Sequence, residues 1–322
     1  MSRSVPFQSI PSDAPAAGLR RDRDTITPMR SAPDRRRRSL VATLLALPLV
    51  LRGGEVRAST LRVATLDYAL AQTLMVLGCP PIAIGDGRDW EKWVREPPLA
   101  PDTVDLGASL DPNMELLAAL KPDLILTTDF VALTESRLTR VAPVRRINLY
   151  SEGGSPFPKA IAATREIGAI VGKSAEAERY LAETESFFDE SAARARPFRD
   201  HPVAILSFLD QRHVRVTGRP GLYQDVLDRL GLRNAWEEPT NYWGFSTIGL
   251  ERLVALGDAV VVADFMPDDV AATLPDSPLW RELPFVRNGK IPVLPTVLVF
   301  GGIPSARRFA TLILDALEKG RA

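Results

Sequence analysis

The sequence predicts an α/β protein with two lobes bridged by a single long helix. Residues 174–196 place apolar side chains at i, i+3 and i+4 spacing opposite a charged face, which is typical of an amphipathic helix. Ser174 is its expected N-cap. Such a helix would be on the order of 30 Å long, roughly the diameter of a small domain. The segments before and after it both alternate strands with helices, which predicts an α/β lobe on each side. The alternative is a surface helix of one larger domain.

The first lobe contains four expected strands, and two longer helices lie between them. Asp111 is the expected N-cap of the second helix, with Pro112 at its first position. The near-continuous apolar run of the third strand is typical of a parallel strand that is covered on both faces. The expected strands are 61–66, 81–86, 123–128 and 144–150, and the helices are 67–78 and 114–121, with a further short helix around 135–141.

The second lobe follows similar logic. Strands are expected at 202–209, 213–218 and 291–300, and a helix at 222–231. Segments 114–130 and 250–265 share one order of features: a helix, a tight turn, a buried strand and a terminal Asp-Phe pair. Ligands of open α/β sheets bind beyond the carboxyl ends of the strands. A cleft between the lobes is therefore expected, lined by residues that follow strands.

The first 58 residues are expected to be an export leader. Arg35–Arg38 precede an apolar run, residues 40–51, that is too short to span a bilayer, and 56–58 offer an A-x-A-like cleavage pattern. Arg37-Arg38 resembles a twin-arginine signal, which predicts a periplasmic protein. Met29 is an alternative start, and an arginine-rich tail before a buried helix is the competing interpretation. The predicted division is 1–58 leader, 59–155 N-terminal lobe, 156–197 helical linker and 198–322 C-terminal lobe.

Composition argues against several classes of function. Residues 59–322 carry 29 basic and 35 acidic side chains, so no basic nucleic-acid footprint is expected. The one cysteine, Cys79, cannot form an internal disulfide and is expected to be a small buried residue near a helix end. Two histidines, His201 and His213, have no metal-ligand spacing, and phosphate-loop, dinucleotide-binding and serine-nucleophile motifs are absent. An enzyme is therefore not expected.

Aromatic residues stand out in the predicted loops. Trp90 and Trp93, Tyr242-Trp243 and Phe300 lie in stretches flanked by Gly or Pro. Aromatic side chains in such loops often line a pocket for a bulky, partly apolar ligand. The alternative, packing on a lobe core, is strongest for Trp90.

With these residues in hand, the chain resembles the periplasmic ferric-hydroxamate (ferrichrome-type) siderophore-binding proteins of ABC importers, from about Leu61 to the C-terminus. The resemblance implies a monomeric, non-catalytic protein that bends little and delivers a ferric siderophore to an inner-membrane ABC permease. It also implies that the siderophore, not the protein, holds the iron. The segments that carry it are 93–99, 111–117, 222–231, 234–236, 240–244, 278–280, 284–290 and the VFGG stretch.

The resemblance also implies ligand-binding positions. Trp93 and Trp243 match aromatic pocket positions of the family. Phe130 and Phe300 lie where the family has tyrosines, the former if one residue is inserted after it. Ser109 replaces the pocket arginine of the family, and serine has neither the charge nor the reach of a guanidinium. Iron-chelate binding is thus better supported than the hydroxamate class.

Docking to the permease is expected through one acidic residue on each lobe. The matching positions are Glu135 and Glu251, which would pair with permease arginines. Glu115, the repeat counterpart of Glu251, competes for the first role, and ordinary solvated glutamates are the remaining alternative.

Two further points stay open from the sequence. Arg88, Lys92 or Arg95 could supply the cation that Ser109 lacks. The alternative cargoes are haem or a corrinoid, with bare zinc or manganese a weaker variant, and the alternative class is a secreted ligand-modifying enzyme.

Overall fold

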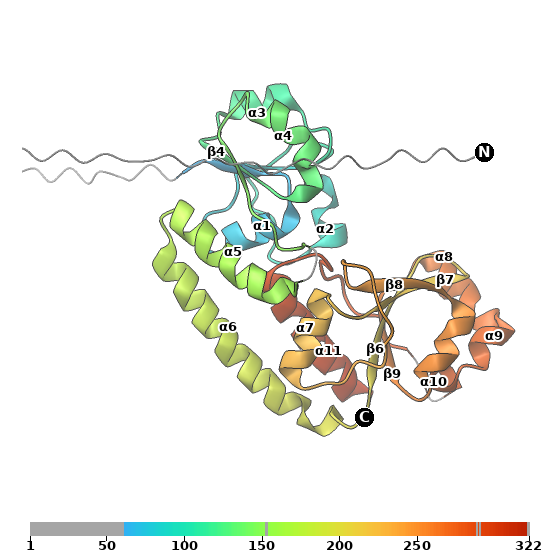
Figure 1. Cartoon of the computed structure of the whole chain (residues 1–322). Helices are drawn as coiled ribbons and strands as arrows, with labels where there is room; N and C mark the ends of the chain where they lie inside the picture. The colour runs from blue at the N-terminus through green and yellow to red at the C-terminus, as the bar shows by residue number, and fades with distance from the viewer. Residues whose placement is uncertain (1–60, 152–153, 288, 290, 321–322) are drawn as a thin grey trace, which may run out of the picture. The chain divides into compact units, whose positions relative to one another are not determined.

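The computed structural model describes residues 61–151, 154–287, 289 and 291–320. These residues belong to one compact unit, Arg57–Ala322 (Figure 1). The expected leader, residues 1–58 with its twin-arginine pattern, lies outside the described residues. No helix in the described part of the chain is long and apolar enough to cross a membrane.

The N-terminal half forms a five-stranded sheet in which every neighbouring pair is parallel, as the alternating pattern predicts. One face of the sheet carries Val63 and Leu126, which pack with helices α1, Tyr68–Val76, and α5, Pro156–Ile170. The other face carries Ala64 and Ile125, which pack with helices α3, Met114–Leu120, and α4, Glu135–Leu138. The order is β3-β2-β1-β4-β5, with β1 Val63–Thr65, β2 Ala83–Ile84, β3 Val104–Asp105, β4 Leu124–Thr127 and β5 Val144–Arg146. The connecting elements are α1 Tyr68–Val76, η1 Gly87–Asp89, α2 Trp90–Trp93, α3 Met114–Leu120, η2 Asp129–Thr134 and α4 Glu135–Leu138.

The C-terminal half forms a four-stranded sheet that is mixed rather than parallel. Only β6 and β9 pair in parallel, while β7 pairs antiparallel with both β6 and β8. The link of four residues between β6 and β7 is too short for the crossover that a parallel pair needs. Strand β8 is a further element that the sequence pattern does not indicate. The order is β8-β7-β6-β9, with β6 Val203–Phe208, β7 His213–Thr217, β8 Phe245–Gly249 and β9 Val260–Phe265.

Four helices join the two sheets through one continuous apolar core (Figure 1). Helix α6, Ser174–Ala195, is the predicted long helix, and it packs against α5, Pro156–Ile170, α7, Leu222–Leu230, and α11, Ile303–Lys319. The core that they share includes Val63 of the first sheet and Ile205 of the second. The two lobes are therefore connected by packed side chains as well as by the chain itself.

Three local predictions are wrong. Lys173, not Ser174, is the N-cap of α6, and Ser174 lies inside the helix. Asn113, not Asp111, caps α3, because its side-chain oxygen accepts a hydrogen bond from the Leu116 amide at 2.9 Å. Residues 291–300 form no strand and only a single bridge to β9, between Val293 and Ala263, since prolines at 292 and 295 have no N–H to donate.

The remaining elements complete the C-terminal half. Segment 250–256, the counterpart of α3 in the sequence repeat, is a 3₁₀ helix rather than an α-helix. Cys79 is 5% exposed just after α1, which confirms that it is a buried residue at a helix end. The remaining helical elements of the C-terminal half are η3 Arg196–Phe198, η4 Leu250–Leu256, α8 Asp268–Thr273, η5 Leu274–Asp276, α9 Pro278–Arg281 and α10 Pro284–Arg287.

Candidate functional site

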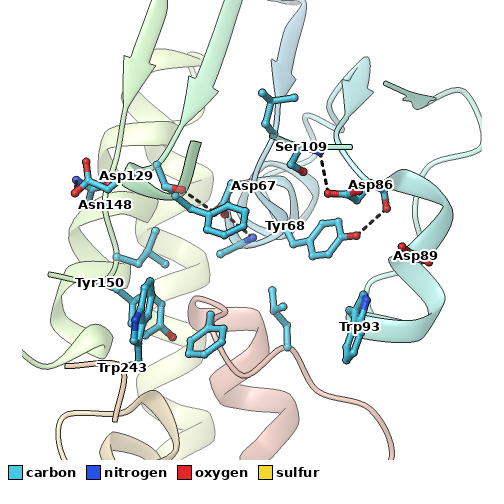
Figure 2. A pocket seen from close by; sticks show the side chains of 17 residues that line it. Asp67, Tyr68, Asp86, Asp89, Trp93, Ser109, Asp129, Asn148, Tyr150 and Trp243 are labelled. Atoms are coloured by element: carbon cyan, nitrogen blue, oxygen red, sulfur yellow. Dashed lines mark hydrogen bonds between the residues drawn. The ribbon is translucent and has the colours of Figure 1, made fainter. Parts of the chain in front are cut away.

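A cavity of about 500 Å³ lies where the two halves of the chain meet. Most of its lining follows the strands of the first sheet: Leu66–Ala69 after β1, Asp86 after β2, Thr128–Phe130 after β4 and Asn148–Tyr150 after β5. The C-terminal half contributes Trp243, Leu298 and Phe300. The cavity is therefore the cleft that the strand-end rule predicts (Figure 2).

Asp67 anchors the floor of the cavity. Its carboxylate caps α1 by accepting hydrogen bonds from the Ala69 and Leu70 amides, at 2.8 and 3.1 Å. The Thr128 hydroxyl donates to the other carboxylate oxygen at 3.0 Å. Burial raises the pKa of Asp67, and these three donors oppose that rise. The carboxylate thus has a structural task, joining the ends of β1 and β4.

Ser109 lines the cavity and its backbone supports the Asp86 carboxylate. The Ser109 amide donates to Asp86 Oδ2 at 2.9 Å, and the Tyr68 hydroxyl donates to the Asp86 carbonyl at 2.7 Å. Ser109 is only 5% exposed and packs against Gly85, where a Cβ atom would lie 2.4 Å from its Oγ. Burial, followed by the charges of Asp86 and Asp89, raises the pKa of Tyr68, so its hydroxyl stays a donor.

Asp129 is neutralised by a neighbour outside the cavity lining. Its carboxylate pairs with Arg146 at 2.8 Å and accepts a hydrogen bond from Asn148 Nδ2 at 2.7 Å. Arg146 also pairs with Glu135 at 2.5 Å, and the Thr127 hydroxyl donates to Glu135 at 2.7 Å. The hydrogen bond from Arg146 is the main reason that the pKa of Glu135 is lowered.

Three rings close the opposite side of the cavity. The Trp243 ring centroid lies 5.9 Å from Tyr150 and 5.1 Å from Phe300, and the Tyr150 and Phe300 rings meet edge-on at 5.8 Å. The Tyr150 hydroxyl donates to the Gly301 carbonyl at 3.0 Å, with the Val299 carbonyl at 3.2 Å. Burial raises the pKa of Tyr150, so this donor persists at neutral pH. The first lobe therefore fixes Phe300 in the wall.

Two of the predicted aromatic residues lie toward the solvent. Trp93 is 40% exposed, with its ring 6.0 Å from Phe265 of β9, and Phe130 is 61% exposed. The Lys92 amine lies 4.5 Å from the Trp93 ring centroid. Lys92 does not line the cavity, and neither do Arg88, which pairs with Asp105, or Arg95. None of these three basic residues replaces the family arginine inside the cavity.

A layer of polar groups lies behind the aromatic wall. A hollow of about 40 Å³ shares Trp243 and Phe300 with the main cavity and is also lined by Arg215 and Tyr223. Arg215 Nε, Tyr223 Oη and Asp264 Oδ2 are buried and have no hydrogen-bond partner among the described residues, although the Ser207 hydroxyl donates to Asp264 Oδ1. Burial raises the pKa of Asp264 to about 6.

The structure brings together all five residues that the sequence indicated for the ligand site. Trp93, Ser109, Phe130, Trp243 and Phe300 each line the cavity. Trp90, by contrast, is 1% exposed and belongs to the core, and its indole N–H donates to the Pro97 carbonyl at 3.0 Å.

The sequence analysis missed the carboxylates and tyrosines of the lining. Asp67 and Asp86 come within two residues of the ends of β1 and β2. Tyr150 is four residues past β5, and Tyr68 directly follows Asp67. The strand-end rule, applied to every strand rather than to the two Asp-Phe pairs, would have found them. Asp89 lies on a 3₁₀ turn and gave no signal.

The two candidate docking residues differ in their surroundings. Glu251 is exposed at the start of η4, and no described residue forms an ion pair with it. Glu135 is half-buried and already held by Arg146 and Thr127. Glu115 is exposed in the first turn of α3.

Comparison with known proteins places this site in a family context. The family model described as "Periplasmic binding protein" matches residues 63–298. The iron(3+)-hydroxamate-binding protein FhuD of Escherichia coli is 30% identical over 285 residues, covering 87% of this chain and 96% of that protein. The Fe(3+) dicitrate-binding periplasmic protein FecB of E. coli is 27% identical over 231 residues, covering 69% and 72%.

A solved structure agrees with this assignment. The siderophore-binding protein FhuD of Vibrio cholerae, with bound Fe³⁺–Desferal, superposes with a TM-score of 0.76 at 29% identity. The match covers 80% of this chain and 98% of that one. The chain belongs to the periplasmic binding protein family.

Proposed function

We propose that this chain is the substrate-binding component of an ABC importer, that it captures a ferric siderophore of the hydroxamate type in the interlobe cavity, and that it has no catalytic activity. The observation that carries the proposal is the cavity itself, about 500 Å³ and walled by aromatic side chains. That volume is in the range of small-molecule sites. The similarity to two proteins named for ferric hydroxamate or siderophore binding supports the choice of ligand.

The iron is proposed to arrive already chelated. Within the part of the chain that the structure describes, no group of three or more His, Cys, Asp or Glu side chains is placed to hold a metal ion. Aromatic rings and carboxylates around the cavity would contact the organic shell of the chelate. Trp93, Ser109, Phe130, Trp243 and Phe300 remain the proposed ligand-binding residues.

Tryptophan fluorescence of residues 59–322 tests the proposal. Trp93 and Trp243 line the cavity, so a bound ferric chromophore should quench them saturably. The panel holds ferric hydroxamate, catecholate and citrate complexes, with haem and cobalamin representing the alternative cargoes. We expect saturation by hydroxamates. Quenching by haem or cobalamin alone would reassign the cargo, and turnover of any chelate would contradict a purely binding role.

Permease docking is proposed to use Glu251 together with an acidic residue of the first lobe. Glu135 is the position given by the family resemblance, but its ion pair with Arg146 leaves it less available than the exposed Glu115. Charge reversal separates the two candidates. Glu251→Lys should abolish permease-dependent iron uptake while chelate affinity stays unchanged. Of Glu115→Lys and Glu135→Lys, the variant at the true docking residue should do the same.

The control for docking is Glu190→Lys, an exposed position on α6. Uptake that survives both Glu115→Lys and Glu135→Lys would contradict docking through this lobe.

Export and assembly complete the proposal. A twin-arginine leader, residues 1–58, would deliver the chain folded to the periplasm, where it would act as a monomer. The lobe boundaries proposed from sequence are 59–155 and 198–322, with the helical linker 156–197 between them. Replacing Arg37-Arg38 with Lys-Lys should retain the precursor in the cytoplasm if this route is used.

A further inference from the structure

The charge of the cavity lining is unusual for a site that would hold an anion. Seventeen of the described residues line it, and among these the side chains charged at neutral pH are four aspartates, with no lysine, arginine or histidine. The four are Asp67, Asp86, Asp89 and Asp129. An anionic ligand in this cavity would face these carboxylates without a compensating cation.

Two of the four carboxylates are already occupied by the protein. Asp129 forms an ion pair with Arg146 at 2.8 Å. Asp67 caps α1 and accepts a further hydrogen bond from the Thr128 hydroxyl. Their charge is therefore balanced or distributed within the structure, and they are not free to meet a ligand.

The other two carboxylates have no cationic partner among the described residues. The Asp86 carboxylate accepts one hydrogen bond, from the Ser109 amide, and forms no ion pair with a described residue. The Asp89 carboxylate has neither a hydrogen bond nor an ion pair within the described part of the chain. Arg88, adjacent in sequence to Asp89, is turned to Asp105 at 3.4 Å. A negative patch consisting of Asp86 and Asp89 is thus left at one side of the cavity (Figure 2).

Aromatic residues lie on the same side of the cavity as this patch. Figure 2 shows Asp86, Asp89 and Trp93 on one side, with the Tyr68 hydroxyl directed at Asp86. The Lys92 amine already lies 4.5 Å from the Trp93 ring centroid, so this ring has a cation of its own. The two carboxylates are therefore the groups that an ammonium of the ligand would meet.

We infer that the cavity selects ferric hydroxamates that carry a positive charge, with the cationic substituent placed between Asp86 and Asp89. The inference rests on the proposed function and adds the charge class of the ligand. In a ferric tris-hydroxamate the three ligand groups balance the charge of Fe³⁺, so the net charge comes from the substituents. A terminal primary ammonium makes the complex cationic, whereas ferric citrate and catecholate complexes are anionic.

The test compares two chelates that share one iron centre. The probes are the ferric complex of Desferal, which ends in a primary ammonium, and the same complex with that amine acetylated. We expect residues 59–322 to bind the cationic complex about 10-fold more tightly, because partly exposed ion pairs with two carboxylates distinguish the two complexes. Raising the salt concentration from about 50 mM to about 500 mM should reduce this ratio through screening.

Variants at Asp89 test whether the ratio of the affinities for the cationic and the acetylated complexes depends on the negative patch. Asp89→Asn should lower the ratio of the two affinities to about 3, and saturable binding of the acetylated complex by this variant shows that it folds. Asp89→Lys should bring it below 1. The matched control is Glu91→Gln, which removes a charge two residues away on α2 without touching the cavity, and it should leave the ratio unchanged.

A ratio near 1 in the unmodified chain, or a ratio that persists in Asp89→Asn, would overturn the inference and leave the proposed function intact. Failure of both hydroxamate complexes to bind, combined with binding of anionic ferric citrate, would overturn both. Tight binding of the acetylated complex alone would confirm the hydroxamate class and reject the charge preference.

Discussion

The two walls of the cavity are built in different ways. On the N-terminal side, polar side chains follow parallel strands and are held by their own hydrogen bonds. On the C-terminal side, Trp243, Leu298 and Phe300 come from loops and present apolar surface, and the polar groups Arg215, Tyr223 and Asp264 lie behind them. The comparison indicates that the two walls have different roles. The first wall positions charged groups, and the second supplies an apolar contact surface whose position depends on side-chain packing.

Sheet topology explains the difference. All five strands of the first sheet are parallel, so their carboxyl ends meet at one edge and the residues after them converge. In the second sheet β7 runs opposite to the other three strands, so β6, β8 and β9 end on one side and β7 ends on the other. The lining residues of the second wall, Trp243, Leu298 and Phe300, lie in loops and do not directly follow any of these strands.

The largest effect is expected where two loops of the second wall touch. Gly244 has φ +83°, and a Cβ atom there would lie 2.2 Å from the Gly221 Cα. Gly244→Ala should displace the Trp243 loop and lower the free energy of unfolding by about 3 to 4 kcal/mol, combining overpacking with a left-handed backbone. Chemical denaturation measures this loss.

The control is Gly172→Ala, which has φ +70° and no atom within 4 Å of the added Cβ. It should cost only the backbone strain, about 1 to 2 kcal/mol. Equal losses in the two variants would show that close approach at Gly244 is unimportant.

Removing the central ring of the second wall comes next. Trp243→Ala takes away the ring that contacts both Tyr150 and Phe300. We expect a 30- to 100-fold loss of chelate affinity, about 2 to 3 kcal/mol, as for a buried aromatic anchor. Calorimetric titration measures it, since fluorescence loses its probe.

Tyr242→Ala is the matched comparison, because Tyr242 adjoins Trp243 but does not line the cavity. If it proved as damaging as Trp243→Ala, loop order rather than ligand contact would explain the loss.

The free energy of unfolding should depend on pH because of Asp264, which lies in the polar layer behind the rings. The folded pKa of Asp264 is about 6, above the usual value of 3.8, so the folded state binds this proton more tightly than the unfolded chain does. Stability that is present below about pH 4 should therefore be lost as the pH rises to about 6. Asp264→Asn removes this dependence and should gain about 2 kcal/mol over the wild type between pH 4 and pH 8.

Denaturation curves at several pH values measure this difference. A constant difference between the two proteins across that range would contradict an elevated pKa for Asp264.

The smallest effect concerns the hydrogen bond that links the walls. Tyr150→Phe removes the hydroxyl that donates to the Gly301 carbonyl but keeps the ring that contacts Trp243. We expect about 1 kcal/mol less stability and a loss of affinity of only a few-fold. Tyr180→Phe, far from the cavity on α6, is the control. A loss as large as that of Trp243→Ala would mean that the hydrogen bond, not ring packing, positions the second wall.

Much of the fold could be predicted because its signals are local. The amphipathic pattern of 174–196 matches α6 to within one residue, and the first sheet follows from alternating strands and helices. The mixed second sheet could not be predicted, because the order and direction of strands depend on long-range pairing. The Phe245–Gly249 strand begins directly after a Gly-containing turn and pairs only with β7, so its short sequence gave little signal.

The site was predictable in part for a similar reason. The strand-end rule and the family resemblance led to the five ring and serine positions, which all line the cavity. The charge of the lining was not predicted, because it depends on which aspartates are paired. Only the folded structure shows that Arg146 pairs with Asp129 and Arg88 with Asp105, so that Asp86 and Asp89 have no cationic partner among the described residues.

The apolar core that runs from the first sheet through α5, α6, α7 and α11 to the second has a consequence for dissecting the molecule. Cutting the chain near residue 198 would expose Phe157 and Phe188 on one fragment and Phe309 on the other, all of them buried in the intact protein. Fragments with such surfaces tend to aggregate. The two halves should therefore be recoverable only when produced together, reassembling as complementary fragments around α6.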